Sequence, residues 1–285
     1  MSTLPTRRTL TQECFLDLRD LIYERSGIFF PENKLYLLEG RLNKRLDELE
    51  LESFEAYVSY LRRQSIQTEE LKQVYNLITI NETYFFRYMK QLEVFSQTLL
   101  PNMVKSREKD PIRRIRIWSA ASSSGEELYT IAMMVKEQLN GQLQRWNLDL
   151  LGTDISNKIL ADARTAVYGR NSFRGSANAY YKSKYFAQEG TQLKMRDDIK
   201  QMVRFDYLNL NDLSAIRRQR GVDFLFCRNV LIYFDQDMKK KVLRSFYDIL
   251  NHGGYLFLGE AESLHGISSA FKVEHFPGAF VYRKE

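Results

Sequence analysis

The sequence contains few of the residues that build disulfide frameworks or metal sites. It has two cysteines and three histidines among 285 residues. Cys14 and Cys227 lie far apart without C-x-x-C spacing, which argues against a disulfide framework and against a zinc site. The histidines show no metal-ligand spacing either. We therefore expect two reduced thiols and no bound metal.

The sequence also lacks a long hydrophobic run. Its N-terminus, "MSTLPTRRTLTQECF", contains no apolar segment of the kind found in a secretory signal peptide. The most apolar stretch, "VDFLFCRNVLIYF", is too short to cross a bilayer and is interrupted by Arg228. We expect a cytoplasmic protein that does not insert into the membrane.

The residues that are present suffice for a large core. With 44% hydrophobic and 13% aromatic residues, the chain can form one large domain or two modest ones. The formal net charge of +6 permits an acidic partner, such as nucleic acid, an anionic membrane or an acidic protein face. Net charge alone does not choose among these partners.

The hydrophobic period changes along the chain. Up to about residue 90, apolar residues recur at spacings of three and four, which predicts amphipathic helices separated by short polar breaks such as "SGIFFPEN". From about Ile112, short apolar runs alternate with helix-like segments, which predicts βαβ units and a parallel sheet. Residues 168–202 fit neither period and are predicted to be an insertion with a small structure of its own. The expected strands are 113–118, 148–153, 203–208, 222–227 and 255–259, followed by an antiparallel pair at 271–276 and 279–283.

The segment "RIWSAASSSGEELYTIA", residues 116–132, leads from a predicted strand through small residues into a helix. Ligands of open α/β sheets bind beyond the carboxyl ends of strands, and small side chains let a ligand approach the backbone. The turn has one glycine instead of G-x-G-x-x-G, and Glu126 and Glu127 would repel a phosphate. The pattern favours a cationic ligand without phosphate, and S-adenosylmethionine meets both conditions. Alternatively, Ser124 and Glu127 form a capping box that only stabilises the helix.

Polar residues at two further predicted strand ends and at one junction extend this candidate site. Asp154 ends the strand in "LDLLGTDIS" and could accept hydrogen bonds from ribose hydroxyls; alternatively, Asp154 or Ser156 only caps the next helix. "NLITINETYFFRYMK" joins the helical part to the sheet part, and "VDFLFCRNVLIYFD" follows a buried strand with polar residues. Alternatively, Asn81 is a helix cap, the aromatic residues belong to the core and Arg87 is a solvated surface charge. The D/N-P-P-Y/F pattern of many methyltransferases acting on amino groups of DNA bases is absent.

Five motifs, in this order, resemble those of the chemotaxis receptor methyltransferases, the CheR family. They are "NETYFFR", "IWSAASSSGEELYTIA", "LLGTDIS", "LNL" at 208–210 and "FLFCRNVLIYFD". The resemblance covers nearly the whole chain. It implies an α/β fold: a class I, Rossmann-like S-adenosylmethionine-dependent methyltransferase domain with an N-terminal all-α domain and a small inserted antiparallel β-subdomain. The corresponding division is 1–88 for the helical domain with its linker and 89–285 for the methyltransferase domain, with the insertion at about 168–202.

The resemblance implies transfer of a methyl group from S-adenosylmethionine to the γ-carboxylate of glutamates on cytoplasmic helices of methyl-accepting chemoreceptors. The products would be a glutamate methyl ester and S-adenosylhomocysteine. Arg87 and Tyr233 would be the catalytic residues nearest the methyl group. Glu127 would face the cationic methionine end of the cofactor, and Asp154 its ribose. The residues implied around the cofactor are Asn81, Thr83, Arg87, Ala120, Glu127, Asp154, Asn209, Leu210, Arg228 and Asn229.

The basic cluster of Arg41, Lys44 and Arg45 resembles the receptor-facing helix of the family, although a solvated helix face would look the same. Some family members tether to a receptor's C-terminal peptide through the insertion, where the turn between strands is longer than in "FAQEGTQLKM". We therefore expect no such tether here, and we expect a monomer. Two other functions fit parts of the pattern: a nucleic-acid methyltransferase and a catalytically silent adaptor that binds cofactor and receptor.

Overall fold

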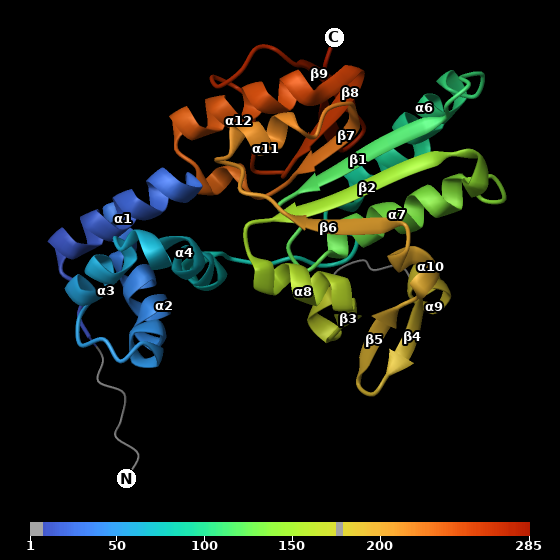
Figure 1. The fold of residues 1–285 in the computed structure, drawn as a ribbon. Helices are drawn as coiled ribbons and strands as arrows, with labels where there is room; N and C mark the ends of the chain where they lie inside the picture. Colours follow the sequence, from blue (N-terminus) through green and yellow to red (C-terminus); the bar gives the residue numbers. More distant parts are fainter. Residues whose placement is uncertain (1–7, 175–178) are drawn as a thin grey trace.

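The N-terminal part of the chain is a group of four helices with its own core. The computed structural model describes residues 8–174 and 179–285. The predicted helical character of this part is confirmed (Figure 1). The buried side chains of this core run from Leu10 to Ile78. The four helices are α1 (Gln12–Ser26), α2 (Leu35–Glu48), α3 (Phe54–Leu61) and α4 (Gln64–Ile78).

Local sequence explains where these helices begin and end. Thr11 and Ser53 accept hydrogen bonds from the backbone N–H three residues later, so each caps the start of a helix. Gly27 ends α1 in the left-handed conformation, at φ 74°. A Cβ at this position would lie 2.6 Å from Cε of Met238, so the end of α1 packs closely on the sheet part of the molecule.

The rest of the chain forms a seven-stranded sheet in the order β6-β2-β1-β7-β8-β10-β9. Five strands are parallel, and β10 pairs antiparallel with both β8 and β9. All the predicted strands are confirmed; β8 begins five residues before the predicted residue 255, at Leu250. The strands are β1 (Arg114–Ala120), β2 (Asn147–Asp154), β6 (Val203–Tyr207), β7 (Val222–Cys227), β8 (Leu250–Leu258), β9 (Lys272–Phe276) and β10 (Ala279–Arg283).

Helices cover both faces of this sheet. Alternate residues of the central strands enter two cores: Phe224 and Phe226 point to one face, and Leu225 and Cys227 to the other. The first core includes residues of α5, α6, α7 and α8, and the second includes residues of α11 and α12. These helices are α5 (Met89–Val94), α6 (Leu100–Ser106), α7 (Glu126–Gln138), α8 (Asn157–Thr165), α11 (Leu213–Arg217) and α12 (Gln236–Ile249), with a π-helical turn at Phe95–Leu99 between α5 and α6.

The expected insertion is a separate three-stranded antiparallel sheet in the order β3-β5-β4. Residues 175–178 of the predicted range lie outside the described residues. Only Gly190 and Thr191 separate β4 from β5, so the turn is as short as the sequence indicates. The elements are β3 (Val167–Tyr168), α9 (Ala179–Tyr185), β4 (Phe186–Glu189), β5 (Gln192–Met195) and α10 (Asp197–Lys200).

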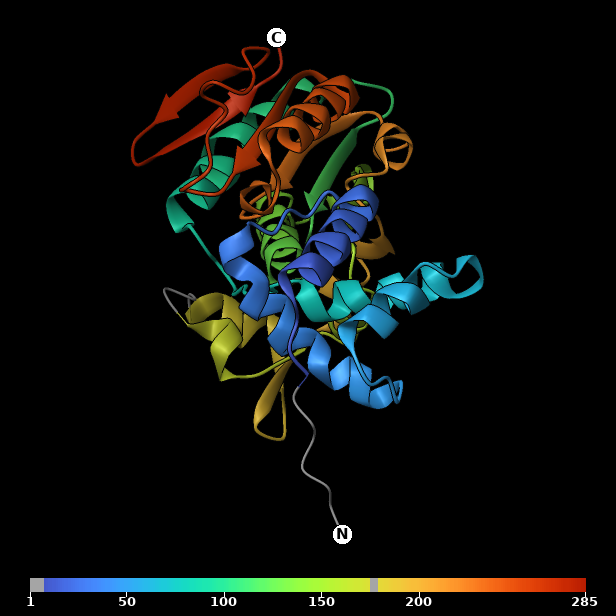
Figure 2. The same cartoon turned by 90° about the vertical axis from the view of Figure 1, so that its left-hand side faces the viewer.

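The four N-terminal helices lie against one end of the large sheet. In Figure 1 the arrowheads of β1, β2 and β7 point toward them, and in Figure 2 they stand in front of the sheet. Tyr23 donates a hydrogen bond to Asp235 at 2.7 Å, and Ser156 donates one to Asn76 at 2.7 Å. The hydrogen bond to Asp235 raises the pKa of Tyr23 to about 12. These contacts place the N-terminal helices over the carboxyl ends of the parallel strands.

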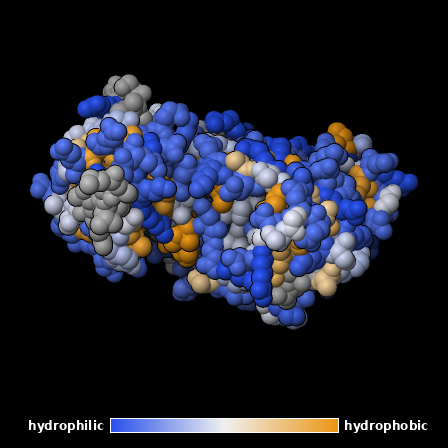
Figure 3. Space-filling model, turned by 90° about the horizontal axis from the view of Figure 1, so that it is seen from below, coloured by the Kyte–Doolittle hydropathy of each residue, from blue (hydrophilic) through white to orange (hydrophobic). Residues whose placement is uncertain are grey.

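The surface in the view from below is mostly hydrophilic. Figure 3 shows hydrophobic residues in small separate groups over both the helical part and the insertion. Among the described residues, no helix combines the length and apolar character needed to cross a bilayer.

Candidate active site

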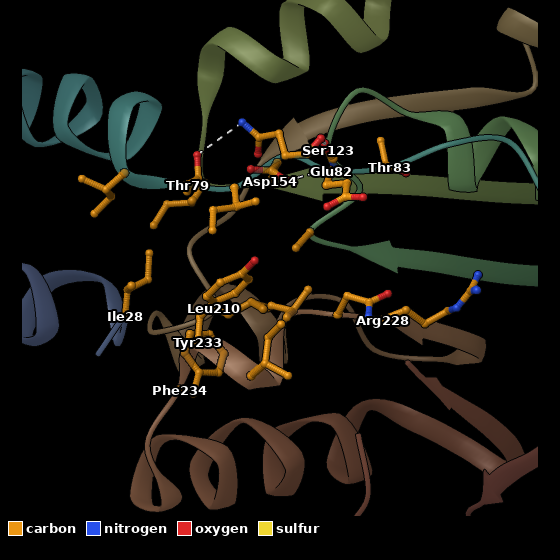
Figure 4. A pocket seen from close by; sticks show the side chains of 18 of the residues that line it. Ile28, Thr79, Glu82, Thr83, Ser123, Asp154, Leu210, Arg228, Tyr233 and Phe234 are labelled. Atoms are coloured by element: carbon orange, nitrogen blue, oxygen red, sulfur yellow. Dashed lines mark hydrogen bonds between the residues drawn. The ribbon is translucent and has the colours of Figure 1, made fainter. Parts of the chain in front are cut away.

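A cavity of about 530 Å³ lies between the N-terminal helices and the carboxyl ends of the parallel strands. The strand order reverses between β1 and β7, so this is where an open α/β sheet leaves a crevice. Figure 4 shows Asp154 and Ser123 on one side and Tyr233 and Phe234 on another, with Ile28 from the N-terminal part facing them. Its volume falls within the range of about 300–1,000 Å³ usual for small-molecule sites.

The turn after β1 has an unusual backbone, with several residues in the left-handed region. Ala121, Ser123 and Gly125 all have positive φ values, of 58°, 52° and 90°. A Cβ on Gly125 would lie 2.9 Å from Cζ of Phe205, so glycine is required both by conformation and by space. Gly125 occupies the N-cap of α7 without a side-chain cap, and Ser124 donates to Glu126 instead. The capping-box alternative for Ser124 and Glu127 is therefore wrong.

Asp154 joins this turn to the end of β2. Its carboxylate accepts hydrogen bonds from the backbone N–H of Ser123 and of Ser156, both at 3.0 Å. Burial raises the pKa of Asp154, and the backbone hydrogen bonds act against that rise. Ser156, not Asp154, caps α8, because its side chain accepts from the N–H of Ile159. Asp154 thus lines the cavity and keeps acceptor capacity for a ligand hydroxyl.

Glu127 lines the cavity as part of a buried ion pair. Its Oε2 lies 3.1 Å from Nη1 of Arg228, and its Oε1 accepts from the hydroxyl of Ser119 at 2.8 Å. The Arg228 side chain is 3% exposed, and burial lowers its pKa. The second nitrogen of its guanidinium donates to the carbonyl of Arg87. Arg228 therefore offsets much of the negative charge that the sequence places at Glu127.

Arg87 has no carboxylate partner among residues 8–174 and 179–285. Its Nη1 donates to the carbonyl of Glu82 at 2.8 Å. Its guanidinium carbon lies 5.7 Å from the ring centre of Tyr84 and 5.2 Å from that of Tyr88. Aromatic rings and one carbonyl thus hold the cation at the cavity wall, where its charge is available to an anion.

Tyr233 and Arg41 lie at the same part of the wall. Burial raises the pKa of Tyr233, and the positive charges of Arg41 and Arg87 act against that rise. In the described part of the chain, the Tyr233 hydroxyl has no hydrogen-bond partner. Arg41 donates to the carbonyl of Ile78, at the end of α4. The cavity therefore presents a hydroxyl and two cations to whatever enters beside Tyr233.

The structure brings most of the predicted site residues together and leaves three away from the cavity. Ala120 is buried in the core beneath the turn, and the cavity wall begins one residue later, at Ala121. Lys44 is exposed away from the cavity. Arg45 instead pairs with buried Glu70 through two contacts of 2.9 and 2.6 Å. The predicted residues that line the cavity are Arg41, Asn81, Thr83, Arg87, Glu127, Asp154, Asn209, Leu210, Arg228, Asn229 and Tyr233.

Sequence patterns missed the contribution of the N-terminal part. The segment "SGIFFPEN", predicted to be only a polar break, supplies Ile28, Phe29, Phe30 and Pro31 to the cavity wall. The backbone N–H of Phe29 donates to the carbonyl of Tyr233 at 2.9 Å, which joins the two parts at the cavity. The pair of phenylalanines between two helices was the available signal, because a linker has no need of large apolar residues.

Residues 8–174 and 179–285 contain no group of three or more histidine, cysteine, aspartate and glutamate side chains placed to hold a metal ion. Cys14 and Cys227 are both buried and unpaired.

Comparison with known families identifies this arrangement. Residues 81–279 match the family model described as "CheR methyltransferase, SAM binding domain", and residues 13–79 match "CheR methyltransferase, all-alpha domain". The protein is thus an S-adenosylmethionine-dependent methyltransferase. It is 38% identical to chemotaxis protein methyltransferase 2 of Vibrio cholerae, over 96% of this chain and 94% of that protein.

Two further relatives agree over most of their length. Chemotaxis protein methyltransferase of Borreliella burgdorferi is 33% identical over 90% of each chain. Chemotaxis protein methyltransferase 1 of Pseudomonas aeruginosa is 32% identical over 93% of this chain and 95% of that protein. The protein belongs to the CheR family of chemotaxis methyltransferases.

Proposed function

We propose that the protein methylates the γ-carboxylate of glutamates on the cytoplasmic helices of methyl-accepting chemoreceptors, with S-adenosylmethionine as donor. The observation that carries this proposal is the guanidinium of Arg87, which reaches the cavity without a carboxylate partner among the described residues. A neutral or cationic acceptor would leave that charge unbalanced, whereas a glutamate carboxylate would balance it. Beside it, the hydroxyl of Tyr233 is also unpartnered within the described chain.

The cavity residues fit the cofactor in size and chemistry. Asp154 offers acceptor atoms to ribose hydroxyls, and the small residues Ala121 to Ser123 let a ligand approach the backbone. Glu127 keeps some negative charge near the position proposed for the methionine end, although Arg228 shares it. Asn81, Thr83, Asn209, Leu210 and Asn229 complete the proposed cofactor contacts, while Ala120 would act only through the backbone that it supports.

The acceptor needs no general base. A glutamate side chain has a reference pKa of about 4.3, so it is ionised near neutral pH. When bound, the cofactor would supply the methyl group from its sulfonium, whose sulfur would keep the electron pair of the broken carbon–sulfur bond, while a carboxylate oxygen of the glutamate would form the new bond. Arg87 would bind and aim the carboxylate, and Tyr233 would hold it in line. Tyr84 lines the cavity and would exclude water, which favours a reaction that neutralises two opposite charges, whereas Phe85 and Phe86 pack in the core away from the cavity wall.

Arg87 should aid binding more than it lowers the chemical barrier. At about 4 Å and an effective dielectric constant near 20, its attraction for a carboxylate is about 4 kcal/mol. That attraction weakens as the carboxylate loses its charge in the transition state. Alignment of oxygen, carbon and sulfur then becomes the main contribution of the protein, and good orientation can supply about 7–11 kcal/mol.

We infer that the receptor helix approaches past α2. Arg41 lies at the cavity wall and Lys44 is exposed one turn further along, so both could face an acidic helix. Arg45 is committed to Glu70 and Glu48, so its share in receptor binding would be small. With a two-residue turn between β4 and β5, we propose no tether to a receptor C-terminal peptide. We propose a cytoplasmic monomer, with its domains divided near residue 88.

Mass spectrometry of receptor cytoplasmic fragments after incubation with the protein and labelled S-adenosylmethionine tests the function. We expect base-labile methyl esters on helical glutamates. An adaptor without catalytic activity would bind S-adenosylmethionine and the receptor fragment but would transfer no label. A nucleic-acid methyltransferase would instead label RNA or DNA and bind it in a strongly salt-dependent manner. Either result, with no ester on the receptor, would contradict the proposal.

A further inference from the structure

One carboxylate outside the cavity holds the segment that follows β7. Glu262 is 5% exposed, and its Oε2 accepts from the backbone N–H of Asn229 at 2.7 Å and of Gly259 at 2.8 Å. Its Oε1 accepts from the N–H of Val230 at 2.9 Å and, more weakly, of Ile232 at 3.3 Å. Within residues 8–174 and 179–285, it forms no ion pair with a basic side chain. Four backbone N–H groups therefore hold this buried carboxylate.

The segment that Glu262 holds carries six residues of the cavity wall, among them Arg228, Asn229 and Tyr233. Asn229 has φ 62°, in the left-handed region, which asparagine adopts more readily than other non-glycine residues. Tyr233 belongs to a single 3₁₀ turn, Leu231–Tyr233, with few hydrogen bonds of its own. Because the N–H groups of Asn229, Val230 and Ile232 bond to the carboxylate, the path of this segment depends on Glu262.

The same segment reaches Arg87 through Tyr88. The side-chain amide of Asn229 donates to the hydroxyl of Tyr88 at 3.2 Å. The ring of Tyr88 contacts two guanidinium groups, at 4.9 Å from Arg228 and 5.2 Å from Arg87. A shift at Asn229 would therefore move the ring on which Arg87 rests.

We propose that Glu262 is a positioning residue for methyl transfer. Its carboxylate fixes the backbone at residues 229–232, and thereby places Tyr233 directly and Arg87 through Asn229 and Tyr88. The inference rests on the proposed roles of Arg87 and Tyr233 at the acceptor carboxylate. Misplacement of reacting groups by about 1 Å can cost about 100-fold in rate, so a residue that touches no substrate can still control turnover.

Glu262→Gln tests the proposal, because it keeps the size of the side chain and replaces one acceptor oxygen with an N–H donor that faces other donors. We expect the turnover number for receptor methylation to fall about 100-fold. Asn229 is a proposed cofactor contact, but the contacts at Asp154 and Ser123 are separate, so the dissociation constant for S-adenosylhomocysteine should rise far less than turnover falls. Turnover is calculated per cofactor-binding site, which removes the effect of any unfolded fraction.

Glu260→Gln is the matched control. Glu260 is two residues away, is exposed and has no hydrogen bond or ion pair in the described chain. It should keep wild-type turnover. Together with the wild-type protein, this control also reports on the proposed function itself: if neither of them methylates the receptor, the function is wrong, whatever Glu262 does.

Gly259→Ala tests the same segment without changing the carboxylate. Its Cβ would lie 2.9 Å from Nδ2 of Asn229 and 2.9 Å from Oε2 of Glu262, so the segment must shift. We expect turnover to fall much more than cofactor affinity, as for Glu262→Gln. The proposal is overturned if folded Glu262→Gln keeps wild-type turnover per site, or if cofactor affinity falls as much as turnover does. If Glu262→Gln does not fold, wild-type turnover in Gly259→Ala overturns it.

Discussion

The charged side chains of the cavity differ in how far the protein itself balances them. Arg228 pairs with Glu127, and two backbone N–H groups bond to the carboxylate of Asp154. Arg87 has only aromatic rings and a carbonyl. Arg87 is only partly buried, and a cation at a cavity wall without a carboxylate partner attracts an anionic ligand. At the residue scale, this is the feature that most directly supports a carboxylate acceptor.

Tyr233→Phe removes the hydroxyl and keeps the ring, so it tests the acceptor role separately from packing. We expect the dissociation constant for S-adenosylhomocysteine to stay within about twofold of wild type and turnover to fall by about 10-fold or more. Calorimetry and a methylation assay on the same preparation measure the two effects. Loss of cofactor binding in calorimetry would contradict an acceptor-side position for this residue.

The burial of the Glu126 carboxyl group can be tested through the pH dependence of the free energy of unfolding. Burial raises the pKa of Glu126, and its carboxylate accepts from the hydroxyls of Ser124 and Ser172. Because the folded-state pKa lies above the unfolded value, this group's contribution to stability is lost as the pH rises through the folded pKa. Glu126→Gln should therefore lose less free energy of unfolding than the wild type does as the pH rises.

Urea unfolding of wild type and Glu126→Gln at several pH values measures this effect. The difference between the two proteins should shrink as the pH falls toward 4.5. Glu108→Gln, at an exposed position, should show no such trend. A pH-independent difference would mean that the hydrogen bonds of Glu126, and not its charge, determine the effect.

At the scale of elements, the start of α7 shows how packing selects the turn. Gly125 is the N-cap of α7 and lies against Phe205, Ala163 and Tyr129, which belong to β6, α8 and α7. Its conformation lets the chain reverse from β1 into α7 within a few residues, and this reversal presents Ala121 to Ser123 to the cavity. The small-residue turn is therefore a consequence of close packing as well as a ligand site.

Gly125→Ala should destabilise the protein by about 2–4 kcal/mol, because it adds both left-handed strain and a steric clash. Cofactor affinity should fall as well, since the turn must move. Gly141→Ala is the matched control: Gly141 also has positive φ, of 73°, but nothing lies within 4 Å of an added Cβ. It should cost only about 1 kcal/mol. Equal losses in thermal unfolding would show that backbone strain alone matters at Gly125.

At the scale of the whole molecule, the cavity lies between the core of the N-terminal helices and the core of the sheet part. Residues from Ser26 to Arg41 line it from the helical part, and the loops after β1, β2, β6 and β7 line it from the sheet. Two hydrogen bonds near the cavity connect these parts, from Tyr23 to Asp235 and from Phe29 to Tyr233. A ligand in the cavity contacts both parts at once.

Binding of S-adenosylhomocysteine should therefore stabilise both parts. At a concentration 100 times its dissociation constant, the gain is about 2.7 kcal/mol for any unit that must be folded to bind. Calorimetric unfolding should show a higher melting temperature for every transition, with adenosine alone giving a smaller shift. If a transition assigned to α1–α4 by hydrogen exchange stays unchanged, the helical part does not contribute to the cofactor site.

The amino-acid sequence alone determined the secondary-structure elements and the position of several cavity residues. The elements were predicted by patterns that each reflect burial along one segment. These patterns are the helical spacing in α1–α4, the short apolar runs in β1, β2 and β7, and the small residues after β1. The polar residues at the strand ends were also predictable, since parallel strands present their carboxyl ends at one edge. Asp154, at the end of β2, and Arg228, directly after β7, reach the cavity for this reason, whereas Arg87 reaches it from the segment before α5.

Only the tertiary structure decided which side chains meet. Two ion pairs join residues that are far apart in the sequence: Arg45 and Glu70 are 25 positions apart, and Glu127 and Arg228 are 101 positions apart. The hydrogen bonds of Glu262 go to backbone N–H groups, which the residue types do not specify. The apolar residues of "SGIFFPEN" became cavity wall because α1 and α2 pack against the sheet edge. A pattern along the chain reports burial, whereas charge balance and cavity shape depend on which elements the fold brings together.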